Sequence, residues 1–204
     1  MKNAVITSAR QYGSGGREVG LKLAELTGLS YYDKDLITMA AQKSGLNQAV
    51  LHAADEKAAN SLLYTLALGS STYHAGASSL HVPLNDKLFT VQSEIIRDIA
   101  KENKGAIIVG RCADYVLADH TNLLRVFVSA DFDNRVKTIM QRHDLSEGDA
   151  KDLIVKTDRR RSNYYNYYTG GKWAKLENYD LIVSTDKIGI ENAAKLIQSY
   201  MEMM

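Results

Sequence analysis

The sequence predicts an α/β fold in which a doubly wound parallel sheet of five strands is covered by helices. Short runs of β-branched and apolar residues alternate with longer segments of helical periodicity, which is typical of βαβ units. The first of these runs opens directly into a glycine-rich loop and then a helical pattern. The chain has 204 residues, 45% of them hydrophobic, which is enough to bury one core without disulfides or metals. We therefore expect a single domain over residues 1–204.

Each expected strand is short and apolar, and the segments between strands have the periodicity of helices. In chain order the strands are Val5–Ser8, Ser30–Tyr32, Ala106–Val109, Leu124–Val128 and Leu181–Val183. The helices carry apolar residues three or four positions apart, which gives each of them one apolar face. They are Arg17–Leu26, Asp86–Lys101, Asp131–Arg142, a helix that begins at Ser146, and Ile190–Met201. Ser146 and Asp149 form an approximate capping box at the start of the fourth of these helices.

The alternation is interrupted over about residues 36–85. Two helices are expected there, Asp35–Lys43 and Asn47–Leu68, and the small polar run Gly69–Ser79 that follows them predicts a loop. A helical insertion after the second strand is well placed to cover a ligand at the carboxyl ends of the strands. It is equally compatible with an excursion that takes no part in binding.

The loop after the first strand has the composition of a phosphate-binding loop. Its glycines allow backbone N–H groups to turn towards an anion, and the start of the following helix adds free amides and a favourable dipole. The P-loop pattern G-x-x-x-x-G-K-[ST] also requires a lysine and a hydroxyl residue, but aligned on Gly15 this chain has Gly16 and Arg17 there. The residues expected to hold the phosphates are Arg10, Gly13, Ser14, Gly15, Gly16 and Arg17.

Two other strands end in residues that suit an anionic ligand. Asp33 follows the second strand, and Gly110 and Arg111 follow the third. In an open α/β sheet the ligand lies beyond these carboxyl ends, and an arginine there can bind a phosphate through two parallel hydrogen bonds. A surface ion pair is the alternative role for Arg111.

A basic segment, Lys156–Arg161, lies in the second half of the chain. Successive helical residues are turned by about 100°, so three adjacent arginines cannot share one face. Asp158 and Arg161 are helical neighbours and can act together, whereas Arg160 is expected to face water or an acidic neighbour. A solvated basic helix end is the alternative interpretation.

In their order and spacing, several stretches together resemble the cytidylate kinase-like family, relatives of the bacterial cytidylate kinases. They are Ile6–Ser8, Arg10–Glu18, Tyr32–Ile37, Ile107–Tyr115, Phe127–Ala130, Asp158–Tyr165 and Tyr179–Asp186. The resemblance implies a P-loop kinase-like fold with a nucleoside-monophosphate-binding insertion at about 36–85 and a lid with a tyrosine-rich loop at about 143–178. It also implies a phosphotransferase that uses ATP with nucleotide-borne Mg²⁺, and nucleotide acceptors of which CMP or dCMP is the first expectation.

The resemblance also implies roles for single residues. Gly110 and Arg111 match a pair that meets the acceptor nucleotide, and Arg159 and Arg161 match lid arginines that close over the phosphates. Arg135 is similar to a helix arginine that assists the lid, although an exposed helix surface explains it equally well. The expected catalytic residues are Arg17, Arg111, Arg159 and Arg161, and the expected acceptor-binding residues are Asp33 and Arg111.

The absent loop lysine leaves two functions open. Either Arg17 or Arg10 replaces it in a working kinase, or the chain is a catalytically impaired nucleotide-binding or sensor protein on the same fold. Arginine differs from lysine in length, shape and hydration, so the exchange is not conservative. Magnesium would then be held by Ser14, by an acidic residue such as Asp33, or by the nucleotide alone.

Composition narrows the partners and the compartment. The formal net charge of +1 gives no general attraction to nucleic acid or to an anionic membrane, so we expect neither as a partner. The single cysteine, Cys112, cannot form an internal disulfide and is expected to be a small buried residue. No segment has the length and hydrophobicity of a signal peptide or a membrane span. We therefore expect a soluble cytoplasmic protein.

The aromatic segment Tyr164–Trp173 has two interpretations. Its rings can stack on a nucleobase, but such rings more often pack a loop against the body of a protein or form an interface. We expect packing or an interface here. Symmetric homodimers are frequent, and this segment or the helical insertion is the expected contact if the chain forms one.

Overall fold

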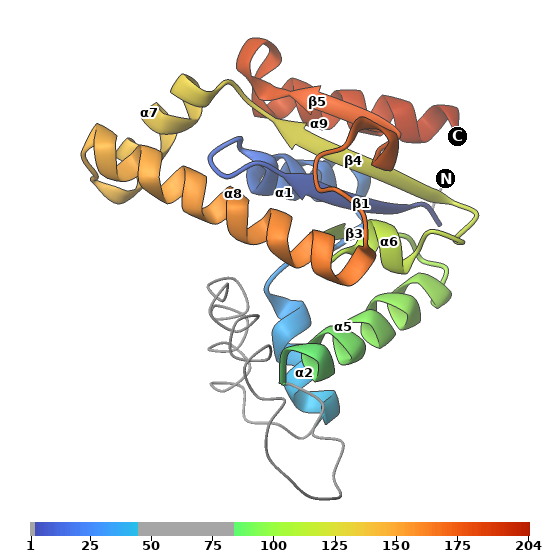
Figure 1. The fold of residues 1–204 in the computed structure, drawn as a ribbon. Helices are drawn as coiled ribbons and strands as arrows, with labels where there is room; N and C mark the ends of the chain where they lie inside the picture. Colours follow the sequence, from blue (N-terminus) through green and yellow to red (C-terminus); the bar gives the residue numbers. More distant parts are fainter. Residues whose placement is uncertain (1–2, 45–83) are drawn as a thin grey trace, which may run out of the picture.

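A five-stranded parallel sheet forms the centre of the computed structural model, which describes residues 3–44 and 84–204 (Figure 1). The strands are β1 (Val5–Arg10), β2 (Ser30–Tyr32), β3 (Ala106–Val109), β4 (Leu123–Ser129) and β5 (Leu181–Ser184). Their order is β2-β3-β1-β4-β5, and every neighbouring pair is parallel. All five predicted strands are confirmed. β1 runs two residues further than predicted, because Ala9 and Arg10 pair with Phe127 and Val128 of β4.

Helices cover both faces of this sheet, as predicted. On one face, α2 (Asp35–Ser44) and α5 (Leu84–Lys101) pack with Val5 and Ile108. On the other face, α1 (Gly16–Thr27) and α9 (Thr185–Met203) pack with Ile6 and Ile107. Successive strand residues therefore face opposite cores, as the two-residue period of a strand requires. Each fully buried isoleucine contributes about 2 kcal/mol of hydrophobic stabilisation, so the helices are held firmly on both faces of the sheet.

Two helices after β4 form a third apolar cluster. They are α7 (Phe132–His143) and α8 (Glu147–Thr169), which pack through Val136, Ile139 and Ile154. The predicted capping residue is confirmed, because the Asp149 N–H donates to Oγ of Ser146. Figure 1 shows α8 crossing beside the loop that joins β1 to α1. This crossing lets α8 supply side chains to the carboxyl edge of the sheet.

The predicted tyrosine-rich loop is helical instead. α8 continues through Tyr164–Tyr168 and ends only at Gly170, whose φ of 66° is left-handed. No glycine or proline interrupts this stretch, and its rings give it a packing partner. The ring of Tyr168 stacks on Phe89 of α5 at 4.1 Å, and its hydroxyl donates to Asp86 at 2.9 Å. Tyr168 thus has the packing role that we expected for this segment, although it lies in α8 rather than in a loop.

The C-terminal helix also starts earlier than predicted. α9 begins at Thr185 directly after β5, and Gly189, at φ 72° and ψ 175°, interrupts it. Glycine adopts this conformation without strain, so the chain turns there and continues as a helix. The predicted start at Ile190 corresponds to the part after this kink.

Two short elements complete the described part of the fold, and some of the predicted segments lie outside it. A short helix, α6 (Ala113–Val116), follows β3, and a single 3-10 turn, η1 (Leu176–Asn178), precedes β5. The predicted helix Asn47–Leu68 and loop Gly69–Ser79 lie outside the described residues, so the role of the insertion stays a prediction. Within residues 3–44 and 84–204, no helix combines the length and apolarity needed to cross a bilayer.

Candidate functional site

The glycine loop between β1 and α1 has the backbone geometry of an anion cradle. Gly13 and Gly15 adopt left-handed conformations, with φ of 82° and 74°. A side chain on Gly13 would also be crowded, because its Cβ would lie 3.1 Å from the Arg135 carbonyl oxygen. α1 starts directly after Gly15, and the N–H groups of its first turn have no partner within the helix. The loop thus presents amides and the positive end of a helix dipole to a ligand.

The side chain of Ser14 points into the protein and contacts backbone carbonyl groups instead of facing a ligand. Its Oγ lies 2.9 Å from the carbonyl oxygen of Gln11 and 3.1 Å from that of Val128. Its residue surface is only 2% exposed, and it lines neither of the cavities described below. The hydroxyl is therefore engaged by backbone carbonyl groups and does not face either cavity.

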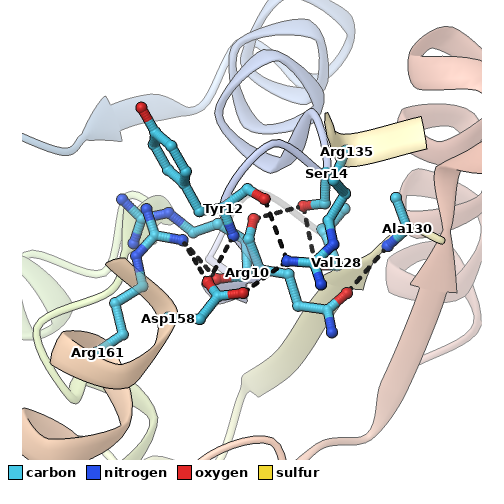
Figure 2. Close-up of polar contacts among 9 residues, drawn as sticks. Arg10, Tyr12, Ser14, Val128, Ala130, Arg135, Asp158 and Arg161 are labelled. Atoms are coloured by element: carbon cyan, nitrogen blue, oxygen red, sulfur yellow. Dashed lines mark hydrogen bonds and ion pairs between the residues drawn. The ribbon is translucent and has the colours of Figure 1, made fainter. Parts of the chain in front are cut away.

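Asp158 of α8 holds the backbone of the same loop (Figure 2). One carboxylate oxygen accepts a hydrogen bond from the Tyr12 N–H at 2.7 Å, and the other accepts one from Nη1 of Arg135 at 2.6 Å. Arg161, one turn further along α8, donates to the Arg10 carbonyl at 2.8 Å. The segment predicted to be a lid is therefore hydrogen-bonded to the phosphate loop. Arg135 is buried by these contacts, which excludes the exposed-surface interpretation.

Asp33 lies between the two arginines that could replace the loop lysine. Its carboxylate is 3.5 Å from Nη2 of Arg10 and 3.3 Å from Nε of Arg17. The side chain of Arg10 is 20% exposed, whereas that of Arg17 is 59% exposed. Both arginines and Asp33 thus belong to one charged group at the carboxyl ends of β1 and β2.

Two adjacent cavities meet at this group. The first, of about 350 Å³, is bounded by β1, the residues after β3, and α8. The second, of about 470 Å³, lies over the glycine loop and the start of α1. Four basic residues line both of them: Arg10, Lys34, Arg111 and Arg161. The first cavity is further lined by Asp114, Thr157, Arg160, Tyr164, Tyr165 and Trp173, and the second by Gly13, Gly15, Gly16, Arg17, Arg142 and His143.

Positive charge is concentrated around these cavities. Seven arginine and lysine side chains line them, against three carboxylates. Burial lowers the pKa of Arg10 and of Arg111, and burial together with the nearby charge of Arg10 lowers the pKa of Arg161 to about 9. Crowded and desolvated guanidinium groups are stabilised by an anion placed among them. A chain with a net charge of only +1 thereby has a strongly basic region around these cavities.

The backbone after β3 is strained at the boundary between the cavities. Gly110, Arg111 and Cys112 have φ of 74°, 59° and 54°, so two successive non-glycine residues are left-handed. Such conformations cost about 1–2 kcal/mol each and persist where the surroundings enforce them. The turn brings Arg111 to both cavities. Cys112 is buried, as expected, and burial raises the pKa of its thiol.

A buried carboxylic acid completes the wall of the first cavity. Asp114 accepts a hydrogen bond from the Tyr165 hydroxyl at 2.9 Å. Burial raises the pKa of Asp114, and this hydrogen bond acts in the opposite direction. The first cavity therefore combines arginines, an acid and aromatic rings, which suits a ligand with both a phosphate and a ring.

Most of the predicted site residues come together here. Arg10, Gly13, Gly15, Gly16, Arg17, Asp33, Arg111 and Arg161 all line one or both cavities. Ser14 and Arg159 do not line them; Arg159 is exposed on α8. Arg160, expected to face water or an acidic neighbour, lines the first cavity, because it shares a helix face with Thr157 and Tyr164.

Lys34 is the main residue that the sequence analysis missed. It lines both cavities and directly follows Asp33 after β2. Its position after a strand of the sheet was the available signal, the same signal that identified Asp33 and Arg111.

The family of the chain follows from comparison with known proteins. The model of the cytidylate kinase-like family matches residues 5–187, which is most of the chain. The chain belongs to this family. A cytidylate kinase from Sulfurisphaera tokodaii is 25% identical over 114 residues, or 56% of this chain and 62% of that protein. A uronate isomerase from Corynebacterium glutamicum is 26% identical over 138 residues, which cover 68% of this chain but only 26% of that protein. The chain thus spans less than two thirds of either relative.

Solved structures extend the likeness over the full length of this family member. An uncharacterized protein from Eubacterium ventriosum superposes with a TM-score of 0.73 at 26% identity, covering 98% of this chain and 99% of that one. A shikimate kinase from Bacteroides thetaiotaomicron superposes with a TM-score of 0.52 at 12% identity, covering 98% of both chains. The second likeness concerns the fold alone and confirms the predicted P-loop kinase-like fold.

Proposed function

We propose that this protein is a phosphotransferase that moves the γ-phosphoryl group of ATP to a nucleoside monophosphate. The observation that carries the proposal is the pair of adjacent cavities that share Arg10, Lys34, Arg111 and Arg161. One cavity lies over a glycine loop that suits a polyphosphate, and the other combines basic and aromatic residues. A donor and an acceptor bound in the two cavities would bring their phosphates together at the shared arginines.

The shared arginines suit the chemistry of phosphoryl transfer. An oxygen of the acceptor phosphate attacks the γ-phosphorus, the bond to the β–γ bridging oxygen breaks, and ADP leaves. Catalysis of this step depends on positioning and on neutralising the charge of the transferring group. Arg111 and Arg161 line both cavities and are the proposed catalytic residues, with Arg17 at the rim of the donor cavity.

Magnesium is proposed to arrive with the nucleotide. The Ser14 hydroxyl is turned inward, and the Asp33 carboxylate is already engaged by two arginines. These residues do not form a ready oxygen cage for the ion. Magnesium bound to the β- and γ-phosphates would supply further charge neutralisation.

The first acceptor to test is CMP or dCMP. Membership of the cytidylate kinase-like family and the likeness to the Sulfurisphaera tokodaii cytidylate kinase support this choice. Trp173, Tyr164 and Asp114 in the first cavity offer ring surfaces and a polar partner for a pyrimidine. Because the acceptor depends on pocket shape, a panel of monophosphates is needed.

A nucleotide-binding protein without turnover is the second candidate function. Two observations favour it. Glycine stands at the position of the P-loop lysine, and Asp33 already forms ion pairs with both Arg10 and Arg17. A sensor needs only to bind, whereas a kinase also needs a cation on the transferring phosphate.

Measurement of ADP release separates the two functions. Purified protein is incubated with ATP, magnesium and in turn CMP, dCMP, UMP, AMP and GMP, with omission of the acceptor and addition of EDTA as controls. Acceptor-dependent ADP formation supports the kinase. Thermal stabilisation by ATP without ADP formation would support the binding protein instead. If ATP neither stabilises the protein nor is turned over, both proposals are contradicted.

A further inference from the structure

The side chain of Arg10 occupies the space in which a side chain of residue 16 would lie. A Cβ atom on Gly16 would be 2.5 Å from Cβ of Arg10 and 3.0 Å from its Cγ. Arg10 is held in β1 by its pairing with Val128 of β4, so its Cβ cannot move aside. Only one of positions 10 and 16 can therefore carry a side chain at this point.

The P-loop pattern also has a side chain at only one of these two positions, but at the opposite one. In G-x-x-x-x-G-K-[ST] the first glycine precedes the second by five residues, and the lysine follows the second. Aligned on Gly15, Arg10 stands at the position of the first glycine and Gly16 at that of the lysine. The chain has a cation where the pattern has glycine, and glycine where the pattern has its cation.

A second glycine makes room for the far end of the same side chain. A Cβ on Gly110 would lie 2.5 Å from Nη1 of Arg10, and Gly110 itself has a φ of 74°. The aliphatic stem of Arg10 thus passes Gly16, and its guanidinium group passes Gly110 and forms an ion pair with Asp33. This path leads the guanidinium to the place where both cavities meet.

We propose that Arg10 supplies, from the end of β1, the phosphate-binding cation that the P-loop pattern supplies from the position of Gly16. The inference rests on the proposed function, in that the loop binds the donor's phosphates. Arg17 is the competing candidate, but it lines only the second cavity and its side chain is 59% exposed. Asp33 keeps Arg10 in place in the free protein, and a bound phosphate takes over part of its role as counter-charge.

The test restores the arrangement of the P-loop pattern, with glycine at position 10 and lysine at position 16. Four variants are compared with the wild type: Arg10→Gln, Gly16→Lys, the double variant Arg10→Gly with Gly16→Lys, and Arg17→Gln, which removes the competing candidate. ATP affinity is measured by calorimetry with magnesium present, ADP release is measured separately, and thermal unfolding with circular dichroism reports the folded state.

We expect Arg10→Gln to weaken ATP binding about 10- to 100-fold, since a charge-assisted contact to phosphate is lost. Gly16→Lys alone should unfold at lower temperature, because the new side chain meets the Arg10 stem. The double variant should regain ATP affinity to within about fivefold of the wild type. Arg17→Gln, which removes a side chain that is 59% exposed and lines only the second cavity, should weaken binding less than Arg10→Gln does.

The proposal is overturned if Arg10→Gln binds ATP as tightly as the wild type. It is also overturned if the folded double variant binds no better than Arg10→Gln. Should the double variant fail to fold, the comparison of Arg10→Gln with Arg17→Gln decides. A wild type that binds ATP but releases no ADP would contradict the kinase proposal while leaving this inference to be judged on affinity.

Discussion

The carboxylate of Asp158 in α8 accepts a hydrogen bond from the backbone N–H of Tyr12, at 2.7 Å, across 146 residues of sequence. Its other oxygen accepts from Nη1 of Arg135 at 2.6 Å, and the same nitrogen lies 3.3 Å from the Tyr12 carbonyl oxygen. One acidic side chain thus joins α7, α8 and the phosphate loop (Figure 2). The loop is preorganised by this network before any ligand binds.

Replacing Asp158 should therefore destabilise the protein as a whole. Asp158→Ala leaves the guanidinium of Arg135, whose side chain is 8% exposed, without its carboxylate. Breaking such a pair costs about 3 kcal/mol, which corresponds to a fall in Tm of about 6–12 °C for a chain of this size. Differential scanning calorimetry measures the shift. Asp152→Ala, an exposed acid on the same helix, is the control and should leave Tm almost unchanged.

Neighbouring arginines of α8 should differ sharply in their effect on ATP turnover. Arg161 lines both cavities and donates to the Arg10 carbonyl, whereas Arg159 is exposed and lines neither cavity. We expect Arg161→Gln to lower kcat/KM about 10- to 100-fold through loss of a charged contact. Arg159→Gln should stay within about twofold of the wild type, as is usual for exposed charges. Equal losses in the two variants, measured by ADP release, would contradict this assignment of the helix face.

The sequence predicted the sheet and the loop because both depend on local patterns. β1 and β3 alternate between two buried faces, and Gly13 and Gly15 are needed for their positive φ whatever surrounds them. The helix face of α8 could not be predicted in this way, because it depends on where the helix docks. The structure leaves Arg159 exposed and places Arg160 at the first cavity. The sequence also could not show whether Arg10 or Arg17 replaces the loop lysine, because only the structure shows that Gly16 lies against the stem of Arg10.

The ion pair between Arg125 and Asp180 should make stability depend on acid pH. Arg125 donates to both carboxylate oxygens, at 3.1 and 2.6 Å, and these bonds hold the pKa of Asp180 below its ordinary value of 3.8. The carboxylate then contributes stability above pH 3.8, and the contribution is lost as the pH falls through the lowered pKa. We expect Asp180→Asn to lower Tm at neutral pH and to converge with the wild type at strongly acid pH.

Thermal scans across this pH range check the sign of the effect. Asp119→Asn, a change at an exposed acid, is the control and should track the wild type throughout. A difference between Asp180→Asn and the wild type that grows towards acid pH would refute the assignment.

Alanine at Gly13 should test how tightly the phosphate loop is packed on α7. Gly13 and Gly28 both have left-handed backbones, with φ of 82° and 71°, so alanine at either position is strained by about 1–2 kcal/mol. At Gly28 nothing lies within 4 Å of the new Cβ, whereas at Gly13 it meets the Arg135 carbonyl oxygen and Ile139, both at 3.1 Å. Gly13→Ala should therefore lower Tm further than Gly28→Ala and also weaken ATP binding, because the loop must shift away from α7. If the two variants unfold at the same temperature and bind ATP equally well, the loop is not held by this contact.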